Sequence, residues 1–139
     1  MRMRRKHNLD ERLEDVNALI LRRTIEDLNM KTSVEKKDYI DFKEVFGRDS
    51  SIELEIGCGK GRFMADLARR NPDVDFIAIE MLSNVIVEAC ERISKEGLDN
   101  VRFMILRAEC LQSYIPPKKG GRFYLNFPTR LPQKGYEKQ

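Results

Sequence analysis

The sequence predicts an α/β fold in which a parallel sheet of about four strands is flanked by helices. Short apolar segments that are typical of strands alternate along the chain with segments whose apolar residues recur at helical spacing. Turn residues separate most of these segments, and such an alternation is typical of a parallel, helix-covered sheet. The alternation starts at residue 51, so we divide the chain into residues 1–50, a basic arm with a helix and a linker, and residues 51–139, the α/β part.

The first fifty residues lack this alternation. Apolar residues recur at nearly helical spacing between Leu9 and Ile20, in highly charged surroundings, which predicts a helix within residues 9–30. Residues 31–50 mix lysine, aspartate, serine and aromatic residues without a period, which predicts an irregular linker. Gly47 and the polar residues behind it are typical of a turn before the first strand.

From residue 51 onward each element has its own signal. The alternating run Ile-Glu-Leu-Glu-Ile predicts a strand, a glycine turn follows it, and the Asn-Pro-Asp run at 71–73 predicts the turn after the next helix. Residues 83–95 carry an apolar stripe at helical spacing, and a loop of prolines, lysines and glycines at 116–121 precedes the last strand. Strands are expected at 52–56, 75–80, 101–106 and 123–127, and helices at 61–70, 83–95 and 109–114.

Composition narrows the classes of function. The chain has 139 residues, of which 41% are apolar, and this is enough for one modest core. It contains no apolar run near the roughly eighteen residues of a membrane helix, and charged residues follow its N-terminus in place of a signal core. We therefore expect a cytoplasmic protein without a membrane partner. Three cysteines without Cys-x-x-Cys spacing and a single histidine, His7, predict neither a metal site nor a disulfide framework.

The basic residues gather at the two ends of the chain. Residues 1–7 contain four lysines or arginines, and residues 118–139 contain six against one glutamate, although the formal net charge is only +3. Clustered cations of this kind favour a polyanion partner, nucleic acid first, because they neutralise phosphates and release counterions. Solvated tails that keep the protein soluble are the alternative explanation.

The run Gly-Cys-Gly-Lys-Gly at 57–61 is typical of a nucleotide-binding loop, because it follows a strand and precedes a helix. Glu55 comes just before this loop, and a carboxylate there repels a pyrophosphate but attracts a sulfonium group. Glu80 ends the second strand, where its carboxylate can accept hydrogen bonds from both hydroxyls of a ribose. The pattern favours S-adenosylmethionine over NAD, with ordinary strand-end acids as the alternative. The candidate residues are Glu55, Gly57, Gly59, Gly61 and Glu80.

Several motifs resemble those of the bacterial tRNA (guanine-N7-)-methyltransferases. They are ELEIGCGKGRFMADLARRNPDVDFIAIEM, SNVIV, NVRF and FYLNFP, in the family's order and spacing over residues 51–127, together with the opening MRMR. The resemblance implies a Rossmann-like class I methyltransferase fold. It also implies S-adenosylmethionine as the methyl donor, a guanine in the variable loop of tRNA as the acceptor, and contacts of Glu55, Glu80 and the three glycines with the cofactor.

The same resemblance assigns further residues and reveals departures from the family's pattern. Near the adenine the family has an acid followed by alanine, whereas this chain has Arg107 and Ala108, with Glu109 as a substitute acid. Thr129 stands where the family has the aspartate of its active centre, so we assign no catalytic residue. The expected tRNA contacts are Arg4 in the basic arm and Asn126, Gln133 and Lys134 near the C-terminus.

Four strands are only half of a doubly wound sheet, and one half builds one wall of the ligand crevice. We therefore expect a C-terminally truncated form of a longer enzyme, with a naturally minimal domain as the alternative. Together with Thr129, this predicts slow or absent methyl transfer by the chain itself. Two other functions stay open: a methyltransferase acting on a small molecule or protein, and a non-catalytic module that binds S-adenosylmethionine or RNA. The oligomeric state also stays open, monomer or homodimer.

Overall fold

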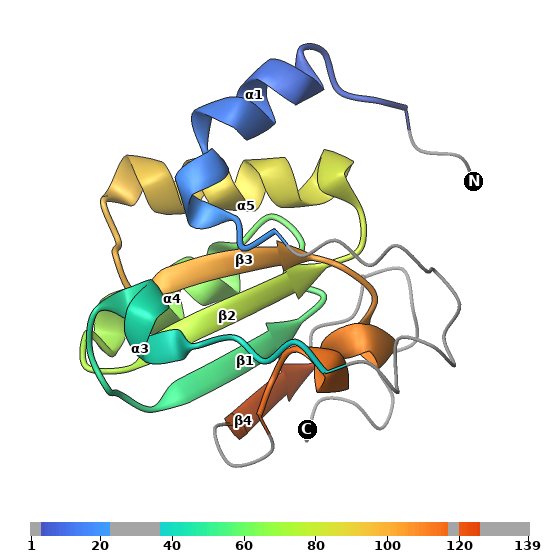
Figure 1. Cartoon of the computed structure of the whole chain (residues 1–139). Coiled ribbons are helices and arrows are strands. Elements are labelled where there is room, and N and C mark those ends of the chain that lie inside the picture. The colour runs from blue at the N-terminus through green and yellow to red at the C-terminus, as the bar shows by residue number, and fades with distance from the viewer. Residues whose placement is uncertain (1–3, 23–36, 117–119, 126–139) are drawn as a thin grey trace, which may run out of the picture.

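The computed structural model describes residues 4–22, 37–116 and 120–125, which form a parallel sheet flanked by helices (Figure 1). The predicted fold class is confirmed. The sheet has the order β3-β2-β1-β4, and every neighbouring pair of strands is parallel. The strands are β1 (Ile52–Ile56), β2 (Asp75–Glu80), β3 (Val101–Ile105) and β4 (Gly120–Leu125).

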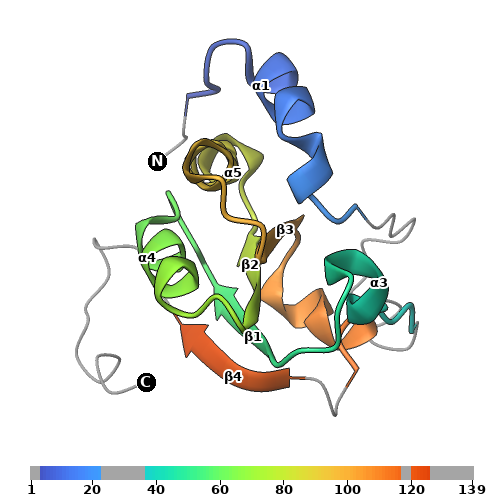
Figure 2. The same ribbon diagram turned by 90° about the vertical axis from the view of Figure 1, so that its left-hand side faces the viewer.

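Two layers of helices cover the sheet (Figure 2). On one face, α4 (Arg62–Arg70) connects β1 to β2, and α5 (Ser83–Glu96) connects β2 to β3. The central strand β2 is buried along nearly its whole length, as expected of a strand covered on both sides. Its residues Phe76 and Ala78 pack among α4 and α5, whereas Ile77 and Ile79 pack into a second core on the other face.

The second core lies under α3 (Phe42–Phe46) and the 3-10 helix η2 (Ala108–Ser113). The sequence predicted an irregular linker over residues 31–50, and α3 corrects that prediction within residues 37–50. Asp41 caps this helix by accepting a hydrogen bond from the Glu44 backbone N–H at 3.2 Å. Gly47 ends the helix in the left-handed region, with φ of 72°. These capping signals were present in the sequence, but the helix is too short to show a period.

The helix expected within residues 9–30 is shorter than predicted. The helix α1 (Leu9–Asp15) is followed by one 3-10 turn, η1 (Asn17–Leu19), and the chain then becomes extended. Ile20 forms a parallel bridge with Phe103, and the Leu21 N–H donates to the Phe103 carbonyl at 2.8 Å. The prediction is therefore wrong for residues 16–22, because pairing with the edge strand β3 replaces helical hydrogen bonds. Residues 23–30 lie outside the described residues.

Other elements differ from prediction by smaller shifts. The helix expected at 109–114 is the 3-10 helix η2, and α4 begins at Arg62 because Gly61 is its N-cap. The strand expected at 123–127 begins earlier, at Gly120, and residues beyond 125 lie outside the described part. The division of the chain at residue 50 stays a prediction.

The helix α1 is fastened to α5 by ion pairs. Arg12 donates to both carboxylate oxygens of Glu91, at 2.8 Å from Nε and 2.5 Å from Nη2. Nearby, Lys6 Nζ lies 2.9 Å from Glu88 Oε1. The hydrogen bond from Arg12 lowers the pKa of Glu91, and the hydrogen bond from Lys6 lowers the pKa of Glu88. Both carboxylates are therefore more acidic in the folded protein than in the unfolded chain.

This acidity predicts that the contact of α1 with α5 weakens in acid. Since the folded pKa is lowered, the contribution is complete above the unfolded pKa of about 4.3 and is lost as pH falls through the folded pKa. Partly exposed pairs are worth about 1 kcal/mol or less. We expect Glu91→Gln to lower the free energy of unfolding by about that amount at pH 7 and by nothing near pH 3. Urea titrations at both pH values measure this, and an equal loss at both would contradict it.

Candidate functional site

The order of strands in the sheet defines where a ligand can bind. The chain runs from β1 outward to β2 and β3, and then returns to place β4 on the other side of β1. In open parallel sheets, ligands bind beyond the carboxyl ends of the strands at such a reversal. All four arrowheads point to the same edge in Figure 1, and the glycine loop and Glu80 follow β1 and end β2 at that edge.

The glycine loop at 57–61 is tied to the end of β2. The N–H groups of Gly57 and Cys58 both donate to the carbonyl of Ile79, at 2.8 and 3.0 Å. Gly61 N–H donates in turn to the Cys58 carbonyl at 3.0 Å. Gly57, Gly59 and Gly61 all have positive φ, of 77°, 56° and 80°. The loop therefore needs glycine at alternate positions for its own backbone path.

Gly59 and Gly61 meet different surroundings. A Cβ atom on Gly61 would lie 2.8 Å from the Cβ of Ala89, so this glycine lets the start of α4 approach α5. A Cβ atom on Gly59 would meet nothing within 4 Å. Gly61 thus serves helix packing, whereas Gly59 borders open space that a ligand can enter.

The Glu80 carboxylate accepts hydrogen bonds from three backbone N–H groups, one in the glycine loop and two in the residues that follow Glu80. Its Oε1 accepts from Gly59 at 3.3 Å, and its Oε2 accepts from Met81 at 2.9 Å and Leu82 at 3.3 Å. A carboxylate has about four acceptor positions, so the described residues leave one of them open, on Oε1. The structure therefore brings Gly59 and Glu80 together, and it holds Glu80 Oε1 beside the Gly59 backbone as a hydrogen-bond acceptor.

Glu55 lies in β1, fully buried, one residue before the strand ends. Burial raises the pKa of the Cys58 thiol, and the nearby charges of Glu55 and Glu80 raise it further. The thiol is consequently neutral at physiological pH and is no nucleophile. The carboxylate of Glu80, which ends β2 beside the loop, favours a cationic ligand group at this edge.

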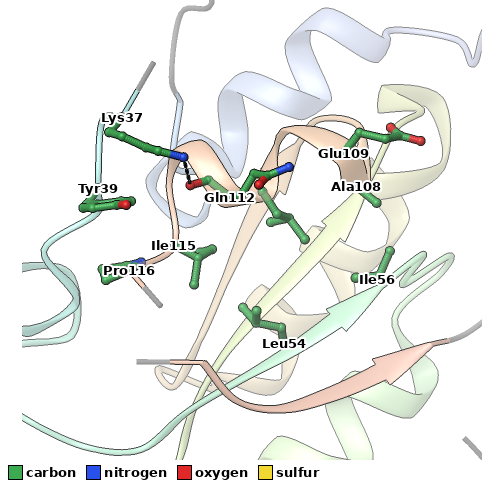
Figure 3. Close-up of a pocket in the computed structure, with 10 residues that line it drawn as sticks. Lys37, Tyr39, Leu54, Ile56, Ala108, Glu109, Gln112, Ile115 and Pro116 are labelled. Atoms are coloured by element: carbon green, nitrogen blue, oxygen red, sulfur yellow. Dashed lines mark hydrogen bonds between the residues drawn. The ribbon is translucent and has the colours of Figure 1, made fainter. Parts of the chain in front are cut away.

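A cavity of about 490 Å³ lies on the face of the sheet that carries η2 (Figure 3). Its volume is in the range of small-molecule sites. The residues that line it are Lys37, Tyr39, Leu54, Ile56, Ala108, Glu109, Leu111, Gln112, Ile115 and Pro116. Two residues predicted to lie near an adenine, Ala108 and Glu109, are thus placed at this cavity. Arg107 Nε lies 3.7 Å from Glu109 Oε2. The arginine that differs from the family's pattern is therefore paired with the glutamate expected to replace the family's acid.

Sequence reasoning missed the wall of the cavity that comes from residues 37–41. Backbone hydrogen bonds hold this segment beside the end of η2, from Asp38 N–H to the Ser113 carbonyl at 2.7 Å and from Ile40 N–H to the Tyr114 carbonyl at 2.8 Å. The Lys37 ammonium donates to the Gln112 carbonyl at 3.4 Å. Only the spacing of the buried Ile40 and Phe42 hinted at this packing in the sequence.

The predicted tRNA contacts have different outcomes. Arg4 is exposed, and its carbonyl accepts a hydrogen bond from the Asn84 side chain at 2.8 Å. Asn126, Thr129, Gln133 and Lys134 lie outside the described residues.

Within the described ranges no helix is long and apolar enough to cross a membrane. Nor do these ranges bring three histidine, cysteine, aspartate or glutamate side chains together as a metal site.

Comparison with solved structures identifies the class of fold. The chain matches an antibiotic-related methyltransferase with a TM-score of 0.52 and 24% identity, over 76% of this chain and 50% of the other. It matches the 30S ribosomal A1408 methyltransferase from an uncultured bacterium with a TM-score of 0.52 and 17% identity, over 78% of this chain and 48% of the other. The fold is therefore that of the class I methyltransferases.

Comparison of sequences then identifies the family. The chain belongs to the family described as "Putative methyltransferase", whose model matches residues 49–139. A tRNA (guanine-N(7)-)-methyltransferase of Geobacillus kaustophilus is 38% identical over 98 residues, 70% of this chain and 45% of that protein. The protein of the same description from Bacillus subtilis is 38% identical over 95 residues, 68% of this chain and 45% of that protein. The chain thus spans less than half the length of these relatives, and the resemblance seen in the motifs is confirmed.

Proposed function

We propose that this chain is the cofactor-binding part of a tRNA (guanine-N7-)-methyltransferase, which methylates a guanine in the variable loop of tRNA with S-adenosylmethionine as donor. The observation that carries the proposal is the placement of Glu80 against Gly59 at the reversal of strand order. The relatives described above supply the reaction and the acceptor. The proposal concerns the whole enzyme, since the chain spans only part of those relatives.

The residues at the loop fit the proposed cofactor. Gly59 borders open space, and the available acceptor position on Glu80 Oε1 suits a ribose hydroxyl. The carboxylate of Glu80 beside the loop favours a sulfonium over a pyrophosphate. When bound, the cofactor supplies an electrophilic methyl group. We propose contacts from Glu55, Gly57, Gly59, Gly61 and Glu80, with Ala108 and Glu109 near the adenine.

Methylation of guanine N7 requires little acid or base catalysis from the protein. Guanine N7 carries a lone pair on the major-groove edge and no proton, so no general base is needed. The work of the protein is then to hold N7 in line with the methyl group, roughly 3–3.5 Å away, and to exclude competing geometries. This agrees with a site built from oriented backbone and carboxylates, in which the cysteine thiol stays protonated.

We propose that the acceptor RNA meets Arg4, Asn126, Gln133 and Lys134. Thr129 can accept a hydrogen bond but cannot supply the negative charge of the aspartate that it replaces, so we assign it no catalytic role. A tRNA-modifying role implies the cytoplasm as the place of action. The proposal holds for a monomer and for a homodimer alike.

Calorimetric titration of the purified chain with S-adenosylmethionine and, separately, with NAD tests the cofactor. We expect S-adenosylmethionine to bind at least about tenfold more tightly, because like charges placed against each other cost several kcal/mol in a binding site. Equal or tighter binding of NAD would overturn the proposal. Failure to bind either ligand, with a folded circular dichroism spectrum, would point to the non-catalytic RNA-binding alternative.

A further inference from the structure

The basic arm is clamped to α5 by one amide side chain. Asn84, in the first turn of α5, donates from Nδ2 to the Arg4 carbonyl at 2.8 Å and accepts at Oδ1 from the Lys6 backbone N–H at 2.6 Å. The amide therefore holds the backbone of two alternate arm residues, as a neighbouring strand would. Because the bonds are made to the backbone, the exposed side chain of Arg4 takes no part in them.

A second residue of α5 places the arm beside the glycine loop. Glu88 lies 2.9 Å from the ammonium of Lys6 in the arm and 3.8 Å from the ammonium of Lys60 in the loop. Arg92 Nε in turn donates to the Lys60 carbonyl at 3.2 Å. In Figure 1 the arm passes over the end of α5 that faces the carboxyl edge of the sheet, which is the edge of the proposed cofactor site.

Cations of the arm and the loop thus share one side of the molecule. Arg5 pairs with Asp10 at 2.6 Å, but both side chains are largely exposed, at 63% and 89%. An exposed pair of this kind contributes little and can exchange its carboxylate for a phosphate at small cost. Arg4 and Arg5 are therefore well placed for a polyanion that approaches the cofactor edge.

We propose that Asn84 is a positioning residue for RNA: it holds the arm so that Arg4 and Arg5 meet the phosphate backbone of the acceptor RNA beside the cofactor loop. This inference rests on the proposed function. The side chain must be an amide, because an aspartate keeps the acceptor for Lys6 but loses the donor to Arg4. Alanine loses both.

Trypsin cleavage within the arm tests the clamp without reference to RNA or activity. The Asn84→Ala chain should be cut after Arg4 or Arg5 about tenfold faster than the parent, because losing both hydrogen bonds raises the population of the released arm. Asn84→Asp should be intermediate. Ser94→Ala, an exposed change at the other end of α5, should leave the rate unchanged. Unchanged cleavage in a natively folded Asn84→Ala chain would overturn the clamp.

Binding of unmodified tRNA across a range of salt concentrations tests the positioning role. Asn84→Ala should weaken binding several-fold and reduce the slope of log affinity against log salt by about one phosphate contact. In a double-mutant cycle, Arg4→Ala should weaken the parent but have little further effect on Asn84→Ala. A purely structural role predicts additive losses. S-adenosylmethionine affinity should be the same in all four chains.

The outcomes separate the inference from the function on which it rests. If tRNA binds to the parent but Arg4→Ala costs the same with and without Asn84, the positioning role is overturned even if trypsin cleavage is faster. If the parent does not bind tRNA, the RNA partner of the proposed function is overturned, and the positioning role falls with it. The trypsin result then still decides whether Asn84 clamps the arm.

Discussion

Replacing Glu80 with alanine should lower the affinity of the chain for S-adenosylmethionine by at least about 100-fold. A hydrogen bond to a charged group contributes about 1.5–3 kcal/mol, and each 1.4 kcal/mol changes affinity tenfold. A ribose hydroxyl on the open acceptor position of Oε1 therefore accounts for about a ten- to hundredfold part of this loss. The carboxylate also orients Gly59, whose N–H it accepts at 3.3 Å, so its removal loosens the loop as well. Calorimetric titration of parent and variant measures the effect.

Two further variants separate contact with the cofactor from support of the loop. Glu80→Gln keeps an acceptor oxygen but not the charge, and we expect a loss of about tenfold. Glu96→Gln removes a carboxylate at the far end of α5, which pairs there with Arg69, and should leave the affinity unchanged. An alanine variant at residue 80 that is natively folded and binds within threefold of the parent would contradict the assignment.

The sequence predicted the sheet and the loop well because their signals are local. The alternation in β1, the buried run of β2 and the glycines between them each restrict the backbone within a few residues. A carboxylate at the end of a strand, such as Glu80, is then placed automatically at the carboxyl edge. The candidate cofactor residues of β1 and β2 could therefore be proposed before the structure.

The N-terminal part was harder to predict because distant contacts decide it. Val16 and Ile20 have the spacing of a helix, yet both are buried in the core and Ile20 pairs with Phe103 instead. The hydrogen bond between Asn84 and Lys6 joins residues 78 positions apart, and a local sequence pattern cannot predict such a contact. The same holds for the cavity wall at Tyr39, which depends on packing beside η2.

Gly61→Ala should destabilise the fold by about 2–5 kcal/mol. The residue has φ of 80°, a conformation that costs a side-chain-bearing residue roughly 1–2 kcal/mol. In addition, the new methyl group would lie 2.8 Å from the Cβ of Ala89 and 3.0 Å from its Cα. Overpacking of this kind costs about 1–3 kcal/mol because helices must separate to relieve it. Urea unfolding followed by circular dichroism measures the total.

Gly97→Ala provides the matched control for the backbone part of this cost. Gly97 has φ of 68°, but a Cβ there would meet nothing within 4 Å, so only about 1–2 kcal/mol should be lost. The excess loss in Gly61→Ala then measures the close approach of α4 and α5. Equal losses would mean that the two helices can part freely at this point.

The double variant Gly61→Ala with Ala89→Gly locates the clash at a single pair of atoms. Ala89→Gly alone should cost about 1 kcal/mol as a glycine inside a helix. If the contact between the two Cβ atoms causes the excess loss, the double variant should be more stable than the sum of the single losses predicts, by about 1 kcal/mol or more. Additive losses would assign the excess to the helix backbone at Ala89. Once an excess loss is measured, either result means that the spacing of α4 and α5 depends on the absence of a side chain at residue 61.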